Sequence, residues 1–159
     1  MTMYVTKVRG LSPQDGAAGG AIAGLAQTAV AMIYGLLNGR SLLSFPNLLG
    51  TLAGQPDTFN GFGLQTLLGI IVNVLILAGL GALFAVIART FEGKQLVYSA
   101  LAFGLVAWAV GYFLILPFWS PELRNDAGPL TTASSMLVYG SVLGTYLSRR
   151  QKRELVSHS

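Results

Sequence analysis

The sequence predicts an all-α fold, an integral membrane four-helix bundle with both termini in the cytoplasm. Hydrophobic residues make up 53% of the chain and charged residues only 10%, whereas about a quarter of the residues in a soluble domain are charged. The apolar residues gather in four stretches, and about 20 residues of helix are enough to cross a bilayer. We therefore expect residues 1–159 to form a single membrane domain.

The first span is expected at about 14–38, and its start is well specified. Ser12 suits the N-cap, Pro13 suits the first helical position, and Asp15 follows where a capping partner of the serine would lie. The apolar stretch 17–37 would form about 31 Å of helix, which is longer than the apolar region of a signal peptide. We therefore expect this segment to be an uncleaved first span and not a signal peptide that is removed.

Three further spans are expected at about 64–88, 96–118 and 130–148. The last is the least hydrophobic because serine and threonine crowd it, so we expect protein rather than lipid to enclose it. The connection 38–61 contains an apolar patch that is too short to span. Three alternatives stay open for this patch: a short amphipathic helix along the interface, a re-entrant loop, or a docking site for a partner.

The distribution of Lys and Arg predicts the orientation, because cytoplasmic loops carry an excess of these residues. In a four-span chain the N-terminus, the second connection and the C-terminal tail share one side. Only Arg40 and Arg124 lie on the other side. The remaining basic residues lie on the shared side, which is therefore predicted to be cytoplasmic: Lys7, Arg9, Arg89, Lys94, Arg149, Arg150, Lys152 and Arg153.

Glycines recur at four-residue spacing in the first span, at Gly16, Gly20 and Gly24. In water each glycine costs a helix about 1 kcal/mol relative to alanine, but in a bilayer glycine lets a second helix approach closely. We expect these glycines to pack against another helix, with a backbone-lined ligand groove as the alternative. The same packing role is expected in the later spans for Gly104, Gly111, Gly140 and Gly144.

The apolar interior of each predicted span lacks Asp, Glu, Lys, Arg and His. Such groups are usual in proton relays and ion pathways, so their absence disfavours those functions. The polar candidates within the membrane are Gln27 and Asn73. Each is expected to form an interhelical hydrogen bond, which contributes about 0.6 kcal/mol on average, with ligand contact as the alternative.

The C-terminal tail, 149–159, is basic, and each basic residue near an anionic membrane surface contributes about 1 kcal/mol. This composition predicts contacts with anionic lipid headgroups, and so short a tail does not predict a nucleic-acid partner. The residues expected to make these contacts are Arg149, Arg150, Lys152 and Arg153.

The chain has no cysteine, and its one histidine, His158, is next to the C-terminus. Haem, iron–sulfur and zinc sites therefore lack their usual ligands within the membrane. No paired carboxylates or Ser-His-Asp set points to catalysis either. We expect no catalytic residues, no metal site and no cofactor of the protein's own. A lipid, quinone or pigment bound at an interface shared with another subunit stays open.

Three short patterns are similar to those of a widespread group of uncharacterised bacterial four-helix inner-membrane proteins: Gly20-x3-Gly24, Leu68-Gly69-x3-Asn73, and Leu116-Pro117 at the end of the third span. The resemblance covers residues 16–121 and implies a multi-pass protein of the bacterial cytoplasmic (inner) membrane. Members of that group often have an acidic residue near the position of Gln27 and a histidine at that of Asn73. Neutral amides at both positions imply that any chemistry of those ionisable groups is absent here.

These observations together favour a non-catalytic accessory or structural subunit of a larger bacterial membrane complex, such as an electron-transfer or photosynthetic complex. Its partners would be other integral membrane subunits. The alternative is a small channel or carrier for a neutral or lipidic solute, lined by Gln27, Asn73 and the hydroxyl groups of the fourth span. A continuous polar face across these helices would favour the alternative.

Overall fold

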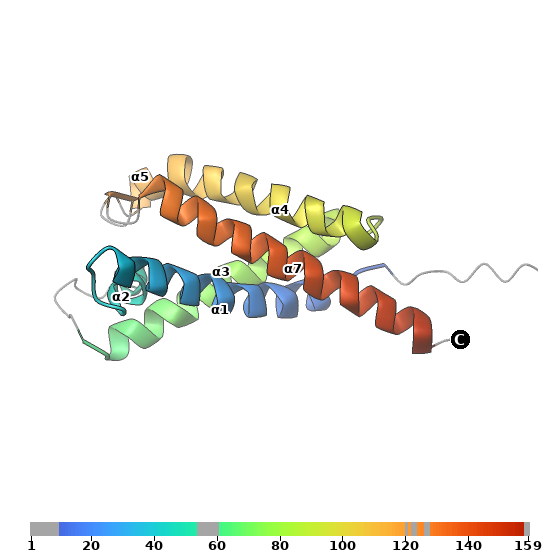
Figure 1. The fold of residues 1–159 in the computed structure, drawn as a ribbon, viewed down its shortest axis with the longest axis horizontal. Helices are drawn as coiled ribbons and strands as arrows, with labels where there is room; N and C mark the ends of the chain where they lie inside the picture. Colours follow the sequence, from blue (N-terminus) through green and yellow to red (C-terminus); the bar gives the residue numbers. More distant parts are fainter. Residues whose placement is uncertain (1–9, 54–60, 120, 122–123, 126–127, 158–159) are drawn as a thin grey trace, which may run out of the picture.

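A computed structural model describes residues 10–53, 61–119, 121, 124–125 and 128–157, and this part of the chain is helical, with no strand. Figure 1 shows the arrangement of its elements. In chain order these are α1 (Pro13–Leu37), α2 (Ser44–Thr51), α3 (Leu64–Ile87), α4 (Gly93–Val110), the π-helical turn η1 (Gly111–Ile115), α5 (Leu116–Trp119) and α7 (Pro129–Ser157).

The predicted start of the first helix is confirmed. Pro13 is its first residue, and Ser12 is its N-cap in an extended conformation. The Ser12 hydroxyl accepts a hydrogen bond from the backbone N–H of Asp15 at 3.1 Å. The Asp15 carboxylate accepts one in return from the Ser12 N–H at 3.4 Å. This reciprocal capping box satisfies N–H groups that the first turn of a helix leaves without intrahelical partners.

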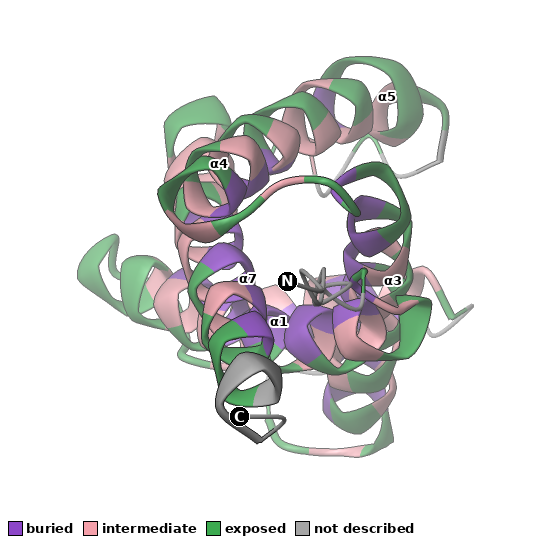
Figure 2. Cartoon of the chain, turned by 90° about the vertical axis from the view of Figure 1, so that its right-hand side faces the viewer, coloured by how far each residue is buried: buried purple, intermediate pink, exposed green. Residues whose placement is uncertain are grey.

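The long helices run alternately in opposite directions, in the lateral order α3, α1, α7, α4 (Figures 1 and 2). α1 packs along both α3 and α7, whereas α4 packs along α7. Within the described residues, α3 and α4 do not pack along each other. The side chains of Phe84 and Phe103 meet between these two helices, with ring centroids 5.2 Å apart.

The start of α1, the α3–α4 turn and the C-terminal part of α7 lie at the same end of the bundle (Figure 1). Arg150 Nε is 3.2 Å from Asp15 Oδ1, which joins α7 to the first turn of α1. Gln151 Nε2 donates a hydrogen bond to the Phe91 carbonyl oxygen at 3.1 Å, which joins α7 to the turn. The segments expected to share one side of the membrane therefore share one end of the fold.

Three helical stretches are long and apolar enough to cross a membrane: Pro13–Leu37, Leu64–Ile87 and Gly93–Phe118. They correspond to the first three predicted spans. The fourth, 130–148, lies within α7, which is not among these stretches. The serines and threonines of this helix lower its hydropathy. α7 also continues through Ser157, so residues 149–157 of the basic tail form a helical extension of α7.

The apolar patch of the connection forms the short helix α2, which packs against α3. Gln65 Nε2 donates a hydrogen bond to the Asn47 carbonyl oxygen at 2.8 Å, and Thr66 Oγ1 donates one to Asn47 Oδ1 at 2.5 Å. A Cβ at Gly69 would overlap the Pro46 carbonyl oxygen and lie 2.8 Å from the Gly50 nitrogen. Hydrogen bonds and a glycine contact thus hold α2 on the start of α3.

Candidate functional site

A group of uncharged polar side chains lies buried in the middle of the bundle, and it contains both predicted polar residues. Asn73 Nδ2 donates to Gln27 Oε1 and to Thr28 Oγ1, each at 2.9 Å. Gln27 Nε2 donates to Ser135 Oγ at 3.2 Å. The prediction that Gln27 and Asn73 form interhelical hydrogen bonds is therefore confirmed, and they bond to each other. This set (Gln27, Thr28, Asn73 and Ser135) is termed the amide cluster below.

The hydrogen bonds continue from the amide cluster to α4. Ser135 Oγ donates to the Thr132 carbonyl oxygen at 2.9 Å, one turn earlier on α7. Trp108 Nε1 in turn donates to Thr132 Oγ1 at 2.9 Å. Side chains of α3, α1, α7 and α4 are thus linked across the whole width of the bundle. This explains why α7, although polar, is accommodated among apolar helices.

Amide and hydroxyl groups donate and accept hydrogen bonds but do not change charge near neutral pH. Every buried side-chain nitrogen and oxygen in the described residues has a hydrogen-bond partner. The amide cluster can therefore fix helix positions or bind a neutral polar group. It has no side chain that would take up a proton from a substrate.

A pocket of about 370 Å³ opens beside the amide cluster, at the end of the bundle that holds α2. Ser135 and Thr132 belong both to its wall and to the hydrogen-bonded chain. The other lining residues come from α1, α2, the connection between them and the start of α7: Ala31, Tyr34, Gly35, Asn38, Arg40, Ser44, Phe45, Leu48, Gly128 and Thr131. Sequence reasoning missed this pocket because its wall is assembled from segments about 100 residues apart.

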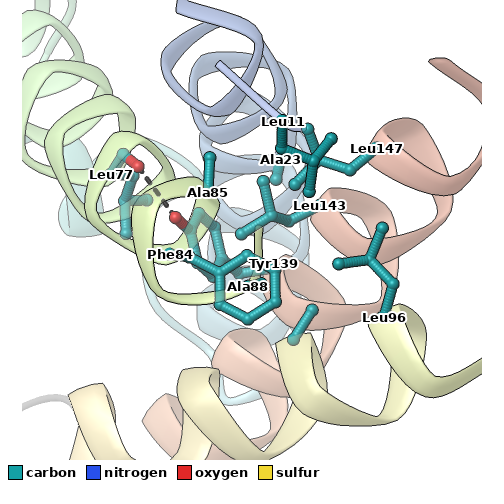
Figure 3. Close-up of a cluster of buried hydrophobic side chains, with 11 residues drawn as sticks. Leu11, Ala23, Leu77, Phe84, Ala85, Ala88, Leu96, Tyr139, Leu143 and Leu147 are labelled. Atoms are coloured by element: carbon teal, nitrogen blue, oxygen red, sulfur yellow. Dashed lines mark hydrogen bonds between the residues drawn. The ribbon is translucent and has the colours of Figure 1, made fainter. Parts of the chain in front are cut away.

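Toward the other end of the bundle the interior is apolar (Figure 3). The Tyr139 side chain is fully buried, and its hydroxyl donates a hydrogen bond to the Leu77 carbonyl oxygen at 2.8 Å. Phe84, Leu143 and Leu147 pack in the same cluster. The polar lining of the pocket therefore ends at the amide cluster and does not continue along the bundle.

Glycines form two close helix contacts on either side of this interior. Along α1 and α3, a Cβ at Gly20 would lie 3.0 Å from Ala78 Cα and from Gly81 Cα. Added Cβ atoms at Gly16 and Gly24 would likewise meet the Gly81 carbonyl oxygen and the Leu77 side chain. The second contact lies along α4 and α7. An added Cβ would lie 2.8 Å from the Met136 carbonyl oxygen at Gly104, 2.6 Å from the Ala100 carbonyl oxygen at Gly140, and 2.8 Å from Val97 Cα at Gly144.

Gly111 does not pack against another helix within the described chain, so helix packing at this position stays a prediction. Beyond its own helical turn, no atom of the described residues lies within 4 Å of the position where its Cβ would be. Gly111 begins the π-helical turn, in which Tyr112 stacks on Trp108 with ring centroids 5.8 Å apart. The spacing of small residues predicts a stripe on a helix, but it does not predict which way that stripe faces.

The predicted headgroup residues lie on the last turns of α7. Arg150 pairs with Asp15, and Arg149, Lys152 and Arg153 are exposed. His158 lies outside the described residues. In the part of the chain that the structure describes, no group of three or more His, Asp or Glu side chains is placed to hold a metal ion.

The fold and the cluster define a class: in its described residues, a helical protein with three helices long and apolar enough to cross a membrane and with a buried cluster of amide and hydroxyl side chains. The chain belongs to a family of unknown function, DUF6789, whose sequence pattern matches residues 12–157. No curated protein and no solved structure matches the chain.

Proposed function

We propose that the protein is a non-catalytic structural subunit of a larger assembly in the bacterial cytoplasmic membrane, which it crosses four times with both termini in the cytoplasm. The observation that supports this role is the free face of α4 and η1. Among the described long helices, α4 packs along α7 alone. Large apolar side chains of α4 and η1 are exposed: Val106 is 61% exposed, Phe113 54% and Leu114 63%.

Lipid alone can cover such a face, but two glycines favour a protein partner. At Gly79 on α3 and Gly111 at the start of η1, an added Cβ would meet no atom of the described residues within 4 Å beyond its own helical turn. A glycine in a helix is unfavourable by about 1 kcal/mol relative to alanine. In a bilayer it is useful where a second helix approaches closely. Since no described helix of the chain lies against these glycines, a helix of another subunit would fit beside them.

The test is photo-crosslinking from matched positions on two helices. A photoreactive amino acid would replace Phe113 on η1 or, as the control, Ile33 on α1, because both side chains are 54% exposed. We expect Phe113 to give one major protein adduct in native membranes and Ile33 to give lipid adducts. Gly111→Leu should abolish the protein adduct without unfolding the chain, since the described residues leave open space at that position.

Equal, lipid-only adducts at both positions would contradict the subunit role. So would a native complex of unchanged mass and abundance in Gly111→Leu membranes.

A second candidate function is a carrier for a small neutral polar solute, and the pocket beside the amide cluster favours it. The pocket wall offers the hydroxyls of Ser135, Thr131 and Thr132 for hydrogen bonds with a solute. The apolar interior beyond them requires a change of conformation for transport. Proteoliposomes that contain the protein should then take up a neutral polyol such as glycerol faster than empty ones. Gln27→Leu, which removes the hydrogen bond from Gln27 to the pocket residue Ser135, should remove the difference.

A further inference from the structure

A second groove, of about 460 Å³, lies between α1 and α7 near the basic end of the bundle. Its residues come almost entirely from α7 and combine apolar, hydroxyl and guanidinium groups. They are Ile22, Ser141, Val142, Thr145, Tyr146, Arg149, Arg150 and Arg153. We term this feature the arginine groove.

The arginine groove is shaped by the contact of the two helices. A Cβ at Gly19 would lie 2.7 Å from Cδ1 of Tyr146, so the tyrosine ring packs directly over the α1 backbone. One turn nearer the start of α1 and the C-terminal end of α7, Arg150 pairs with Asp15 at 3.2 Å. The groove residues of α7 recur every three or four positions, which places them on one side of the helix.

Along α7 the groove passes from apolar and hydroxyl-bearing residues at 141–146 to arginines at 149–153. Ile22 and Val142 supply apolar surface, Ser141 and Thr145 supply hydroxyls, and the arginines lie at the end of the helix. From residue 142 to residue 153 a helix rises about 16 Å. The headgroup layer of a bilayer leaflet is about 5–8 Å thick above about 15 Å of acyl chain. The groove therefore matches a lipid headgroup together with the upper part of one acyl chain.

The charge of the arginine groove is positive. Asp15 balances Arg150, and no other carboxylate of the described residues forms an ion pair with an arginine of the groove. Arg149 and Arg153 are exposed one turn apart. A guanidinium group is planar, permanently charged and suited to bidentate hydrogen bonds with phosphate oxygens. Two such groups beside the apolar part of the arginine groove favour a ligand that carries both a phosphate and a hydrocarbon chain.

We propose that the arginine groove binds an anionic phospholipid of the leaflet on the basic side, with its phosphate at Arg149 and Arg153 and an acyl chain along Ile22 and Val142. This inference rests on the membrane location proposed above but not on the subunit role. The proposed site binds one lipid molecule in a defined place, which differs from a general attraction of the basic tail to a charged surface.

The matched control is Lys152, which lies in the same helical turn and is exposed but does not line the groove. The protein would be reconstituted in nanodiscs of equal phosphatidylglycerol and phosphatidylcholine, released, and analysed by native mass spectrometry. We expect one phosphatidylglycerol to stay bound. Arg149→Ala and Arg153→Ala should each weaken its retention about fivefold, the effect of one basic residue near a membrane surface. Lys152→Ala should change it less than twofold.

Thr145→Trp tests the arginine groove without altering its charge. The threonine is exposed, so the larger side chain can be accommodated, and its indole would fill the groove. We expect it to abolish retention of phosphatidylglycerol. Retention unchanged by Thr145→Trp, or reduced equally by Lys152→Ala and Arg149→Ala, would overturn the proposal in favour of surface charge. Displacement of the lipid by millimolar inorganic phosphate would also overturn it, because the acyl chain would then contribute nothing. Failure of the protein to enter nanodiscs would instead contradict its membrane location.

Discussion

Gly20→Ala is expected to destabilise the bundle, although alanine is the better helix former. The added Cβ would overlap the Leu77 carbonyl oxygen and lie 3.0 Å from Ala78 Cα and Gly81 Cα. These are backbone atoms of α3, so no side-chain rotation can make room. Ordinary contacts between carbon atoms are about 3.5–4.0 Å. α3 must therefore move away from α1 by about 0.5–1 Å, which forfeits about a quarter to a half of the dispersion energy along the contact.

Overpacking of this kind typically costs about 1–3 kcal/mol, and the better helix propensity of alanine offsets about 1 kcal/mol of that cost. We therefore expect the free energy of unfolding to fall by up to about 2 kcal/mol. Gly79→Ala is the matched control on the facing helix, because its added Cβ would meet no described atom within 4 Å beyond its own helical turn. This variant should be as stable as the parent or up to about 1 kcal/mol more stable.

The assay is reversible unfolding in mixed micelles of mild detergent and dodecyl sulfate, followed by circular dichroism. Equal stabilities of Gly20→Ala and Gly79→Ala would refute the reasoning, because the two variants differ only in the space around the new methyl group. A lower stability of Gly79→Ala together with an unchanged stability of Gly20→Ala would show that the wrong face of α3 had been assigned to α1.

Three further variants test other contacts by the same unfolding measurement unless stated. Asn73→Ala removes two interhelical hydrogen bonds, so a loss of about 1 kcal/mol is expected, whereas no change would mean that the amide cluster does not hold the helices together. Tyr139→Phe removes a hydroxyl that donates to a carbonyl oxygen at 2.8 Å; we expect a loss of about 0.6–1.7 kcal/mol, and a stable variant would argue against that bond. Gly69→Ala should push α2 off α3 and speed hydrogen exchange across Ser44–Thr51, with unaltered exchange as the contrary result.

The sequence was sufficient to predict the helices because their signals are local. Ser12, Pro13 and Asp15 mark the start of α1 through a capping box that involves only neighbouring residues. Long apolar stretches likewise mark the first three spans. The length of α7 was less predictable, since its basic residues suggested a separate tail although nothing in the tail stops a helix. The π-helical turn at Gly111 has no signal in the hydropathy pattern.

The candidate site was predictable only in part, because its geometry depends on how the helices meet. Gln27 and Asn73 stood out as amides within apolar helices, but their mutual hydrogen bond depends on the α1–α3 register. Thr28 was missed, since a threonine in a membrane helix commonly bonds to its own backbone, as it also does here to the Gly24 carbonyl oxygen at 2.8 Å. Ser135 could be singled out among the hydroxyls of α7 only once α7 was known to lie against α1.

The central claim is that all four long helices cross the membrane and that the basic end of the bundle is cytoplasmic. Since the chain has no cysteine, Ser41→Cys and Lys152→Cys would each carry a single thiol at an exposed position, at opposite ends of the fold. The measurement is labelling with a membrane-impermeant maleimide in intact and in permeabilised cells.

We predict that Ser41→Cys is labelled in intact cells and that Lys152→Cys is labelled only after permeabilisation. Labelling of both in intact cells would contradict the crossing of α7 and leave the three apolar stretches as the only spans. Labelling of Lys152→Cys alone in intact cells would contradict the orientation.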